Sequence, residues 1–452
     1  MVAPMLTLSR QLVYHLGRLV VDHQGAYRYA VARLLVLFVT AFVDMVGLVM
    51  ILPLLPYYAT TFGANAFVVG LLISAFSLAQ LAVAPFWGRF SDRYGRRPAI
   101  LVGLGISAVA YLIFGLAESV GLLLLSRVIQ GIGGGTIGVV QAYVTDSTAP
   151  DERTKALGWL SAVTSLGAVA GPAFGSALIA VGGRQAPGLG AAALSILVAV
   201  FAWRFLRESR ASGPSSAVKA ANSISEWEAI WRVGTRLNEP PSRLIWTYAI
   251  AIGAFYGTVP IMPLLLVDRL GVTEQTVGYV IMYLGGMGVV VRTLILGKLV
   301  DALGEVRLSR LGVVVLAAGL AVLSVARTFP ALFVSLTLMP LGTAFLFPCV
   351  TGMLSRVVPS GERGLYMGVQ HTFGGVSRVA FPIGAGLIMD NFGLGVPFWI
   401  SALLVLVTLP LTITPPLPGR LARPTTETML VAAAELSGEI STQVTGAETS
   451  GP

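Results

Sequence analysis

Two charged residues of this chain lie inside long apolar segments and are the first candidates for chemistry. Asp44 lies in the sequence FVDMVGLVMILPLLP, and Arg127 lies in the sequence SRVIQGIGGG. A charged side chain at the centre of a bilayer is unfavourable by about 2.5 kcal/mol or more, so it normally faces a cavity or an opposite charge. A carboxyl group in that setting can bind and release a proton. Asp44 and Arg127 are therefore candidates for a proton-exchange site.

The two residues lie at similar depths along their segments. With a helical rise of about 1.5 Å per residue, Asp44 lies roughly 16 Å from Arg33 at one end of its segment. By the same measure, Arg127 lies roughly 9 Å from Gly121 at the other end of its own segment. Across a hydrocarbon core of about 30 Å, these depths differ by only about 5 Å. The side chains can meet directly or through water, which leaves a structural ion pair and a titrating carboxyl group as alternatives.

Further residues inside apolar segments are weaker candidates for a substrate pocket. Arg378 lies about 21 Å into its segment, where it can contact an anionic substrate group, the water around Asp44 or backbone carbonyl groups. Arg292 is within about two turns of Lys298, which favours a side chain that extends to the membrane surface. His371 can carry a proton or form a hydrogen bond between helices. The aromatic candidates, which can line a pocket, pack between helices or face lipid, are Tyr256, Tyr283, Phe345, Phe347 and Phe373.

The composition places these residues in a membrane protein. The chain of 452 residues is 55% apolar and 11% charged, with a mean hydropathy of +0.82, whereas about a quarter of the residues in soluble domains are charged. Apolar runs of roughly 20 residues predict an all-α polytopic fold with twelve spans and both termini on one side. The predicted spans are 33–57, 67–87, 99–117, 121–146, 156–180, 189–206, 244–266, 276–297, 309–326, 331–355, 364–388 and 395–414.

The basic residues sort by membrane side. Of the 30 Lys and Arg residues, 24 fall in the termini and the loops on their side, three fall in the opposite loops, and three lie inside spans. Because cytoplasmic loops carry the excess of Lys and Arg, we expect both termini in the cytoplasm and the chain in a cell inner (plasma) membrane. This sorting accounts for the net charge of +9 without a nucleic-acid partner.

Polar segments divide the chain into regions. Residues 1–30 lack the continuous apolar core of a cleaved signal peptide and are expected to form a cytoplasmic arm. Two six-helix bundles, 31–207 and 244–414, flank a cytoplasmic linker of residues 208–243, part of which can form a short amphipathic helix. The tail of residues 415–452 is expected to be disordered. The single cysteine, Cys349, excludes an intrachain disulfide, and three scattered histidines do not suggest a metal site.

A repeat with an offset of about 210 residues relates the two halves. Pro53 matches Pro263 in the sequences LPLLP and MPLLL. The other matches are Gly88 and Asp92 with Gly297 and Asp301, Pro150 with Pro359, Gly158 with Gly368, and Pro172 with Pro382. A parallel duplication of a six-span unit predicts two pseudo-symmetric bundles.

The segment between predicted spans 2 and 3 has the sequence GRFSDRYGRRP, residues 88–98. Gly88 permits close approach of another helix, and Gly95 permits a tight turn. The segment resembles the G-x-x-x-D-R-x-G-R-R signature of the major facilitator superfamily, in which Asp92 rests on the N-terminus of span 11. Arg96 can bridge to Asp146 at the end of span 4. The resemblance implies that this network latches the outward-facing state. The other basic residues of the segment are Arg93 and Arg97.

The segment around Arg127 resembles a second signature of this superfamily. Arg127, Gln130 and Gly131 match the pattern R-x-x-Q-G-x-G, which is associated with proton-coupled members. The segment around Asp44 is similar to the first span of tetracycline-type and vesicular amine antiporters. The resemblance implies that the two segments together couple proton movement to transport.

Span 5 contains a face of small residues. Gly167, Gly171 and Gly175 are spaced to line one side of the helix and allow close packing, and Pro172 is expected to bend it. The segment resembles the antiporter motif G-x-x-x-G-P-x-x-G-G, except that Ser176 replaces the last glycine. Serine is small, so the packing argument still holds. In the family this motif marks exporters more than importers.

These features cover nearly the whole chain and resemble a drug:proton antiporter of the twelve-span branch of the superfamily. The resemblance implies a monomer in the lipid bilayer that exports an amphipathic small molecule in exchange for protons, by alternating access and without a cofactor. A facilitator or proton-coupled importer of a small metabolite on the same fold is an alternative. A non-transporting membrane receptor is another. An enzyme is not expected, because no constellation of nucleophile, base and metal ligands is visible.

Overall fold

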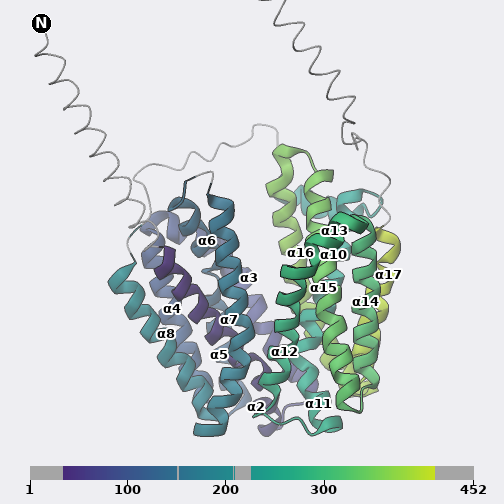
Figure 1. The fold of residues 1–452 in the computed structure, drawn as a ribbon. Coiled ribbons are helices and arrows are strands. Elements are labelled where there is room, and N and C mark those ends of the chain that lie inside the picture. Colours follow the sequence, from purple (N-terminus) through teal and green to yellow (C-terminus); the bar gives the residue numbers. More distant parts are fainter. Residues whose placement is uncertain (1–33, 150–151, 207, 209–224, 413–452) are drawn as a thin grey trace, which may run out of the picture. The chain divides into compact units, whose positions relative to one another are not determined.

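Helices are the only regular secondary structure in the described part of the chain. The computed structural model describes residues 34–149, 152–206, 208 and 225–412 (Figure 1). The predicted arm of residues 1–30 and the predicted tail of residues 415–452 lie outside these ranges.

Twelve apolar helical segments occur where the hydropathy predicts twelve spans. Within the described residues, eleven helices are long and apolar enough to cross a membrane, and the shorter segment Val396–Thr412 supplies the twelfth. Because about 20 helical residues cover a hydrocarbon core of about 30 Å, the all-α twelve-span prediction is confirmed. Spans 1 to 11 are Leu34–Thr61, Ala66–Tyr94, Arg96–Gly115, Val120–Asp146, Arg153–Gly182, Gln185–Phe205, Pro240–Leu270, Val277–Leu303, Glu305–Val325, Phe329–Val357 and Arg363–Phe392.

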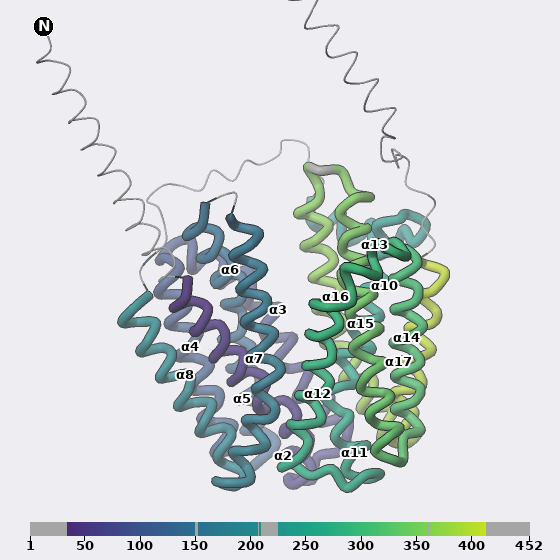
Figure 2. The backbone as a smooth tube through the Cα atoms, viewed as in Figure 1, coloured from purple at the N-terminus to yellow at the C-terminus, as the bar shows by residue number. Residues whose placement is uncertain are grey.

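Each half contributes six of these spans, and Figure 2 shows the halves as separate groups of helices. The N-terminal half contains α2 (Leu55–Thr61), α3 (Ala66–Tyr94), α4 (Arg96–Gly115), α5 (Val120–Gly134), α6 (Ile137–Asp146), α7 (Arg153–Gly182) and α8 (Gln185–Phe205). The C-terminal half contains α10 (Pro240–Thr258), α11 (Met262–Leu270), α12 (Val277–Val290), α13 (Leu296–Leu303), α14 (Glu305–Val325), α15 (Phe329–Val357), α16 (Arg363–Phe392) and α17 (Val396–Val407).

Proline and glycine residues break several spans at matching places. Span 1 passes through a 3₁₀ turn, Leu52–Leu54, that contains Pro53. Span 7 passes through a comparable turn, Val259–Ile261, just before Pro263. Proline lacks the N–H group that continues a helix, so both halves have the same kind of break. The two turns place Pro53 at the position of Pro260, and Pro56 at the position of Pro263, so the predicted match of Pro53 with Pro263 is wrong by three residues.

The segment between spans 2 and 3 is more helical than its composition suggests. Helix α3 continues seven residues past the predicted span end at 87, so Asp92 and Arg93 lie in its last turn. Gly95 is the single residue between α3 and α4, with a φ of 105° that glycine adopts readily. The charged residues at this position are therefore held on rigid helix ends.

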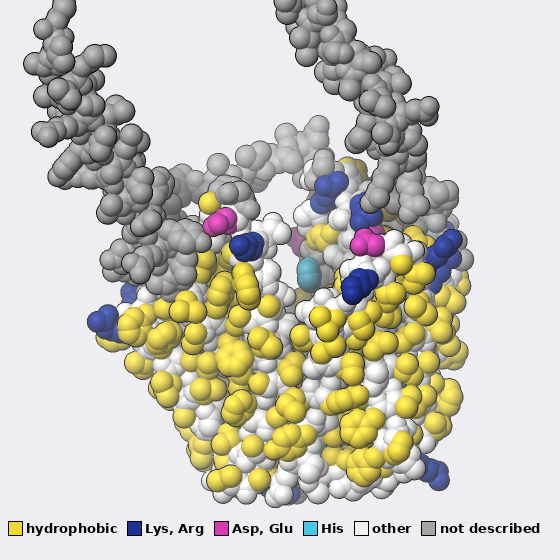
Figure 3. Space-filling view, in the orientation of Figure 1, with side chains coloured by type: hydrophobic (Ala, Val, Ile, Leu, Met, Phe, Trp, Pro, Cys, Tyr) yellow, Lys and Arg dark blue, Asp and Glu magenta, His cyan; other side chains and the backbone are white. Residues whose placement is uncertain are grey.

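Apolar and charged side chains occupy different parts of the surface. Figure 3 shows apolar side chains along the sides of the molecule and charged side chains gathered mainly at one end, which carries Arg89, Arg93, Arg96 and Arg97. We call this the basic end. The outward-facing apolar residues include Trp203, Leu197 and Phe174, each more than half exposed. Such a surface suits a bilayer because lipid tails are as apolar as these side chains.

The two halves contact each other mainly through two helix pairs, α3 with α16 and α7 with α12. Smaller contacts join the broken parts of spans 1 and 7 to each other and to the facing helices. A Cβ atom added at Gly278 would collide with the carbonyl group of Pro172, so α12 and α7 touch through their backbones. The hydroxyl group of Ser176 accepts a hydrogen bond from the N–H of Gly278 at 2.9 Å and donates one to the carbonyl oxygen of Glu274 at 2.8 Å. Arg184 forms an ion pair with Glu274 at 3.1 Å. These contacts join the halves at the end opposite the basic end.

A short helix, α9 (Glu226–Thr235), precedes span 7. Ala229 and Val233 are buried against the C-terminal half, whereas Trp227 and Trp231 are more than 70% exposed. One face of this helix is therefore apolar and packed, and it agrees with the amphipathic helix predicted for part of the linker.

Candidate functional site in the N-terminal half

Asp44 lines a cavity of about 570 Å³ formed by spans 1, 4 and 5. Its volume lies in the range of about 300 to 1,000 Å³ that is typical of small-molecule pockets. The lining residues include Met45, Ile137 and Leu160, which give the cavity apolar walls. Its polar lining residues, besides Asp44, are Thr136, Gln141, Thr145, Ser161 and Thr164. A single acid among hydroxyl, amide and apolar groups can bind a proton or a polar group of an amphipathic molecule.

Arg127 is buried in span 4 and makes contacts of two kinds. It is 2% exposed, and its guanidinium donates a hydrogen bond to the Gln130 side chain one turn along the helix. The guanidinium also lies over the ring of Phe76 in α3, 4.9 Å from the centroid. Its Nε atom has no hydrogen-bond partner. Because an unpaired buried donor is unfavourable by about 1 to 3 kcal/mol, this position favours an additional acceptor.

Asp44 and Arg127 do not form the direct ion pair that was one of the two expected arrangements. Neither residue belongs to an ion pair within the described ranges. Tyr111 of α4 is 1% exposed and lies close enough to Asp44, Gln130 and Arg127 to interact electrostatically with both charges. A Cβ atom at Gly47 would be 3.3 Å from the Tyr111 ring, so this ring rests against span 1, one turn beyond Asp44.

The glycines of span 4 explain how Arg127 reaches the interior. A Cβ atom added at Gly131 would lie 2.7 Å from the Cβ of Ala79 in α3. One at Gly133 would lie 2.8 Å from the hydroxyl oxygen of Ser107 in α4. Span 4 then breaks between Gly134, where α5 ends, and Ile137, where α6 begins. The glycine run thus lets span 4 pack closely against two neighbours just beyond the buried arginine.

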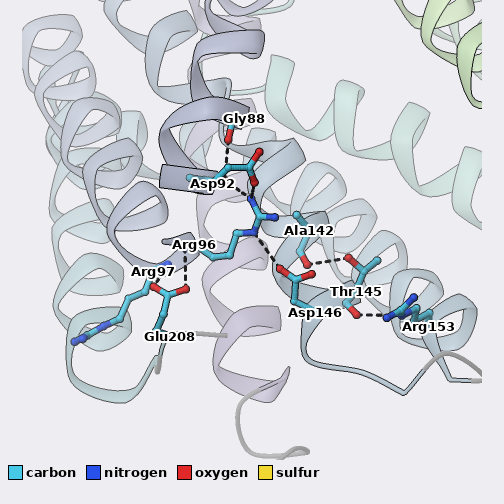
Figure 4. A network of polar contacts seen from close by, with 10 residues as sticks. Gly88, Asp92, Arg96, Arg97, Ala142, Thr145, Asp146, Arg153 and Glu208 are labelled. Atoms are coloured by element: carbon cyan, nitrogen blue, oxygen red, sulfur yellow. Dashed lines mark hydrogen bonds and ion pairs between the residues drawn. The ribbon is translucent and has the colours of Figure 1, made fainter. Parts of the chain in front are cut away.

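A polar network connects spans 2, 3 and 4 at the basic end (Figure 4). The Arg96 guanidinium forms ion pairs with Asp92 at 2.6 Å and with Asp146 at 3.0 Å, and it donates a hydrogen bond to Ser91. The bridge from Arg96 to Asp146 agrees with the sequence prediction. Arg93 lies over the ring of Tyr94 at 5.4 Å.

Glu208 belongs to this network and was not identified from the sequence, which places it in the linker. Its carboxylate accepts hydrogen bonds from the backbone N–H groups of Arg96 at 2.9 Å and Arg97 at 3.1 Å. These are the first amides of α4, where a negative charge is favourable. The Arg97 side chain donates to the carbonyl oxygen of Trp203. The start of the linker is therefore held against the N-terminal half.

Asp92 does not rest on span 11 in this structure, unlike the arrangement implied by the resemblance. Its side chain is 67% exposed and is paired with Arg96 of its own half. A Cβ atom added at Gly88 would meet nothing within 4 Å, so no helix packs closely there. Figure 3 shows the surface hollowed between the halves at this end. The latch between Asp92 and span 11 is therefore open.

The C-terminal half has an equivalent ion pair with exchanged charges. Glu305 begins α14, as Arg96 begins α4, and Arg356 lies near the end of span 10, as Asp146 ends span 4. The Glu305 carboxylate and the Arg356 guanidinium are 2.5 Å apart. These positions follow the repeat offset of about 210, but the reversed charges hide them from a search for the same residue types.

The small-residue face of span 5 packs against span 1. A Cβ atom added at Gly167 would lie 2.6 Å from the carbonyl oxygen of Phe42, and one at Gly171 would lie 2.8 Å from that of Val46. Gly175 approaches the carbonyl oxygen of Met50 in the same way, at 2.5 Å. This contact holds span 1, and hence Asp44, at a fixed distance from span 5. Pro172 lies inside α7 and contacts span 8 of the other half.

The predicted aromatic and basic pocket residues of the C-terminal half separate into two groups. Phe345 is 4% exposed and packs in a core cluster with Val291, Leu308, Ala344 and Cys349. The Tyr283 hydroxyl pairs with Thr337 at 2.9 Å. Phe373 stacks edge-on against Trp246 at 5.4 Å.

A second group gathers around Tyr248 in span 7. The Tyr248 ring packs edge-on against Phe347 at 5.4 Å, and Arg378, Tyr256 and Arg292 lie within electrostatic range of Tyr248. Arg292 lies in a π-helical turn, Val291–Ile295, that interrupts the α-helix of span 8. Arg292 is exposed, and the expectation that its side chain extends to the membrane surface stays a prediction. The neighbouring His371 is exposed and interacts with Arg378 two turns along α16.

Comparison with known proteins places these features in a family. The model of the Major Facilitator Superfamily matches residues 37–308 and 244–443. The chain belongs to the major facilitator superfamily. It is therefore a multi-pass membrane transporter, with small molecules as its substrates.

Two curated relatives within this superfamily match over most of their length. Multidrug resistance protein 2 of Bacillus subtilis is 29% identical over 394 residues, which cover 84% of this chain and 94% of the relative. The class B tetracycline resistance protein of Escherichia coli is 27% identical and covers 80% of this chain and 88% of its own length.

Solved structures show the same fold. The human organic anion transporter MFSD10 (TETRAN) is 24% identical with a TM-score of 0.61, and the match covers 85% of this chain and 99% of that one. A bacterial homologue of the human lysosomal transporter Spinster is 17% identical with a TM-score of 0.69, covering 85% and 95%.

Proposed function

We propose that this superfamily member exports amphipathic small molecules in exchange for protons by alternating access. The observation that carries the proposal is Asp44, an acid within a membrane span that lines a cavity of about 570 Å³. An acid at that depth marks a substrate or proton pathway by default. The relatives named for multidrug and tetracycline resistance support export as the direction.

In the proposed cycle, Asp44 binds a proton in one state and releases it in another. Tyr111 and Gln130 provide polar groups close to Arg127, and Tyr111 also lies within electrostatic range of Asp44. The unpaired Nε of Arg127 favours a nearby negative charge. A proton that moves inward releases roughly 2.3 kcal/mol per 100 mV of membrane potential. This energy drives export once proton release and substrate exit are coupled.

The proposed setting is the cell inner (plasma) membrane, with the basic end in the cytoplasm. This orientation follows from the distribution of Lys and Arg residues. The open surface at the basic end (Figure 3) then corresponds to an inward-facing state. Protons serve as the coupling ion, and a monomer suffices because each half supplies one side of the transport path.

The test uses everted membrane vesicles, in which the cytoplasmic face is outside and respiration acidifies the lumen. Ligands are first selected by thermal shift of the purified protein from tetraphenylphosphonium, tetracycline and an anionic lipophilic dye. Addition of a selected ligand to the vesicles is expected to make the lumen more alkaline, because each exported molecule releases protons from it. Vesicles with Asp44→Asn are the control and are expected to show no change. Ligand entry without proton movement in the unmodified protein would favour a facilitator instead.

A further inference from the structure

Asp390, near the end of span 11, bonds to the N-terminus of span 2 in the other half. One carboxylate oxygen accepts a hydrogen bond from the N–H of Ala66 at 2.9 Å, and the other accepts one from the N–H of Phe67 at 2.8 Å. Asn65 accepts from the next amide, Val68, at 3.0 Å. The first amides of α3 therefore depend on an acid supplied by the other half. A negative charge is favourable at a helix N-terminus.

Helices α3 and α16 pack as antiparallel neighbours beyond this contact. Backbone atoms of Ala66 and Pro382 leave no room for a Cβ atom at Gly386 and Gly70, respectively. The Ser74 hydroxyl donates to the carbonyl oxygen of Val379 at 2.7 Å.

The pairing register predicts what lies at the far end of these helices. In an antiparallel pair of helices, the residue numbers of two contacting residues have a nearly constant sum. Here the sum ranges from 452 for Gly70 and Pro382 to 457 for Phe67 and Asp390. If both helices continued together, the same register would place Asp92 opposite residues 360 to 365. These residues contain the N-terminus of α16 at Arg363.

The two helices end in the same way. Helix α3 ends with Asp92, Arg93, Tyr94 and then Gly95, and α16 ends with Asp390, Asn391, Phe392 and then Gly393. In both, the acid lies two residues before the last helical residue. The glycine that follows has a φ of 105° in one and 103° in the other. Each helix therefore carries, at its C-terminal end, an acid that can reach the N-terminal amides of its antiparallel neighbour.

The two acids are in opposite states in this structure. Asp390 is bonded across the halves, whereas Asp92 is paired within its own half and is 67% exposed.

We propose that Asp390 is the counterpart of Asp92 at the other end of the molecule, and that the two acids bind alternately. Asp390 is a positioning residue: it holds α3 against α16 in the inward-facing state, and its bonds break as the halves separate at that end. Asp92 then reaches the N-terminus of α16 in the outward-facing state. This inference rests on the alternating access of the proposed function. It does not depend on the substrate or on proton coupling.

The test measures distances between spin labels at both ends of the molecule in lipid nanodiscs, without substrate or a proton gradient. Cys349 is replaced by alanine. One pair of labels on exposed residues, Thr61 and Arg327, reports on the end that carries Asp390, and a second pair, on Lys155 and Arg307, reports on the basic end. Each pair joins one half to the other.

Asp390→Ala is expected to increase the population in which Thr61 and Arg327 are far apart by about two- to fivefold. This factor corresponds to the stabilisation that a negative charge gives to a helix N-terminus. The basic-end pair should approach to the same extent. Asp390→Asn keeps one acceptor oxygen and should give a smaller shift. Adding Asp92→Ala to Asp390→Ala should return both distributions toward those of the parent protein, because each state then lacks its acid.

Asp268→Asn is the matched control, because Asp268 is an exposed acid of the same half near the same end. It should leave both distributions unchanged, and size-exclusion profiles and thermal midpoints identify any variant that fails to fold. The proposal is wrong if folded Asp390→Ala protein matches the parent or the Asp268→Asn control. It is also wrong if Asp92→Ala and Asp390→Ala shift the distances in the same direction. Failure of proton antiport in vesicles would leave this result unaffected.

Discussion

The guanidinium of Arg127 lies over the ring of Phe76, 4.9 Å from its centroid, and this contact joins span 4 to span 2. The same guanidinium bonds to Gln130. The planar, delocalised guanidinium makes both contacts at once, whereas the compact ammonium of lysine is a point charge that does not reproduce this shape. The charge of Arg127 and its shape are therefore separable by substitution.

Arg127→Lys is expected to lower the initial rate of ligand-driven proton movement in everted vesicles by about 10- to 100-fold, because a hydrogen bond to a charged group contributes about 1.5 to 3 kcal/mol. Rates are compared at equal amounts of folded protein. Arg292→Lys is the control, because Arg292 is exposed in its π-helical turn. An unchanged rate in Arg127→Lys would show that a positive charge alone suffices.

Tyr111→Phe removes the hydroxyl group in range of Gln130 but keeps the ring that packs against Gly47. We expect proton movement to slow by about fivefold, since the loss of one buried polar group close to Asp44 and Gln130 is worth about 1 kcal/mol. Ligand binding, measured by thermal shift, should stay within twofold. Equal losses of binding and proton movement would contradict a role between Asp44 and Arg127.

Gly171→Ala places a methyl group 2.8 Å from the carbonyl oxygen of Val46, so span 1 must move away from span 5. Overpacking of this kind destabilises proteins by about 1 to 3 kcal/mol, and a lower thermal midpoint is expected. Gly158→Ala on the same helix is the matched control, because a Cβ there meets nothing within 4 Å. Gly158→Ala should be neutral or stabilising by about 0.5 to 1 kcal/mol. Equal midpoints for the two variants would exclude close packing as the reason for Gly171.

The Arg96–Asp146 and Glu305–Arg356 ion pairs occupy equivalent positions with their charges exchanged. We therefore expect either residue of the pair at the basic end to carry the positive charge. Arg96→Glu brings three acids together and should lower stability by about 1 kcal/mol, because the side chains are partly exposed and screened. Adding Asp146→Arg should recover part of this loss, since Glu305 and Arg356 form a pair of that polarity at the equivalent position. The readout is the thermal midpoint. A double variant less stable than the single one would mean that local surroundings, and not the pair, determine the polarity.

The spans and the duplication could be predicted because hydropathy and proline spacing depend only on residue type and order. The depths of Asp44 and Arg127 followed from the helical rise. Their relation did not, because Tyr111 resembles any other aromatic residue of an apolar span until the packing of span 3 is known.

Charged residues at helix ends were harder to assign. Asp390 falls just past the predicted end of its span at 388, and Glu208 falls in the linker. Nothing in their sequence positions distinguishes either from an ordinary loop acid. Their roles depend on which helix N-terminus lies beside them, and that is a property of tertiary packing alone. For Phe345 the sequence left a pocket, packing between helices and the lipid surface open, and the packing of its neighbours selects the core.

Most of the polar contacts between the halves at the end opposite the basic end join a side chain to a backbone group. Asp390, Ser74 and Ser176 each bond to backbone atoms of the facing helix. Every residue has a backbone carbonyl oxygen, and every residue except proline has an N–H group. The facing position can therefore drift in sequence without losing the bond. We therefore expect weak pairwise covariation across this end among relatives. The Arg184–Glu274 ion pair, which needs two matched side chains, is where covariation should be concentrated.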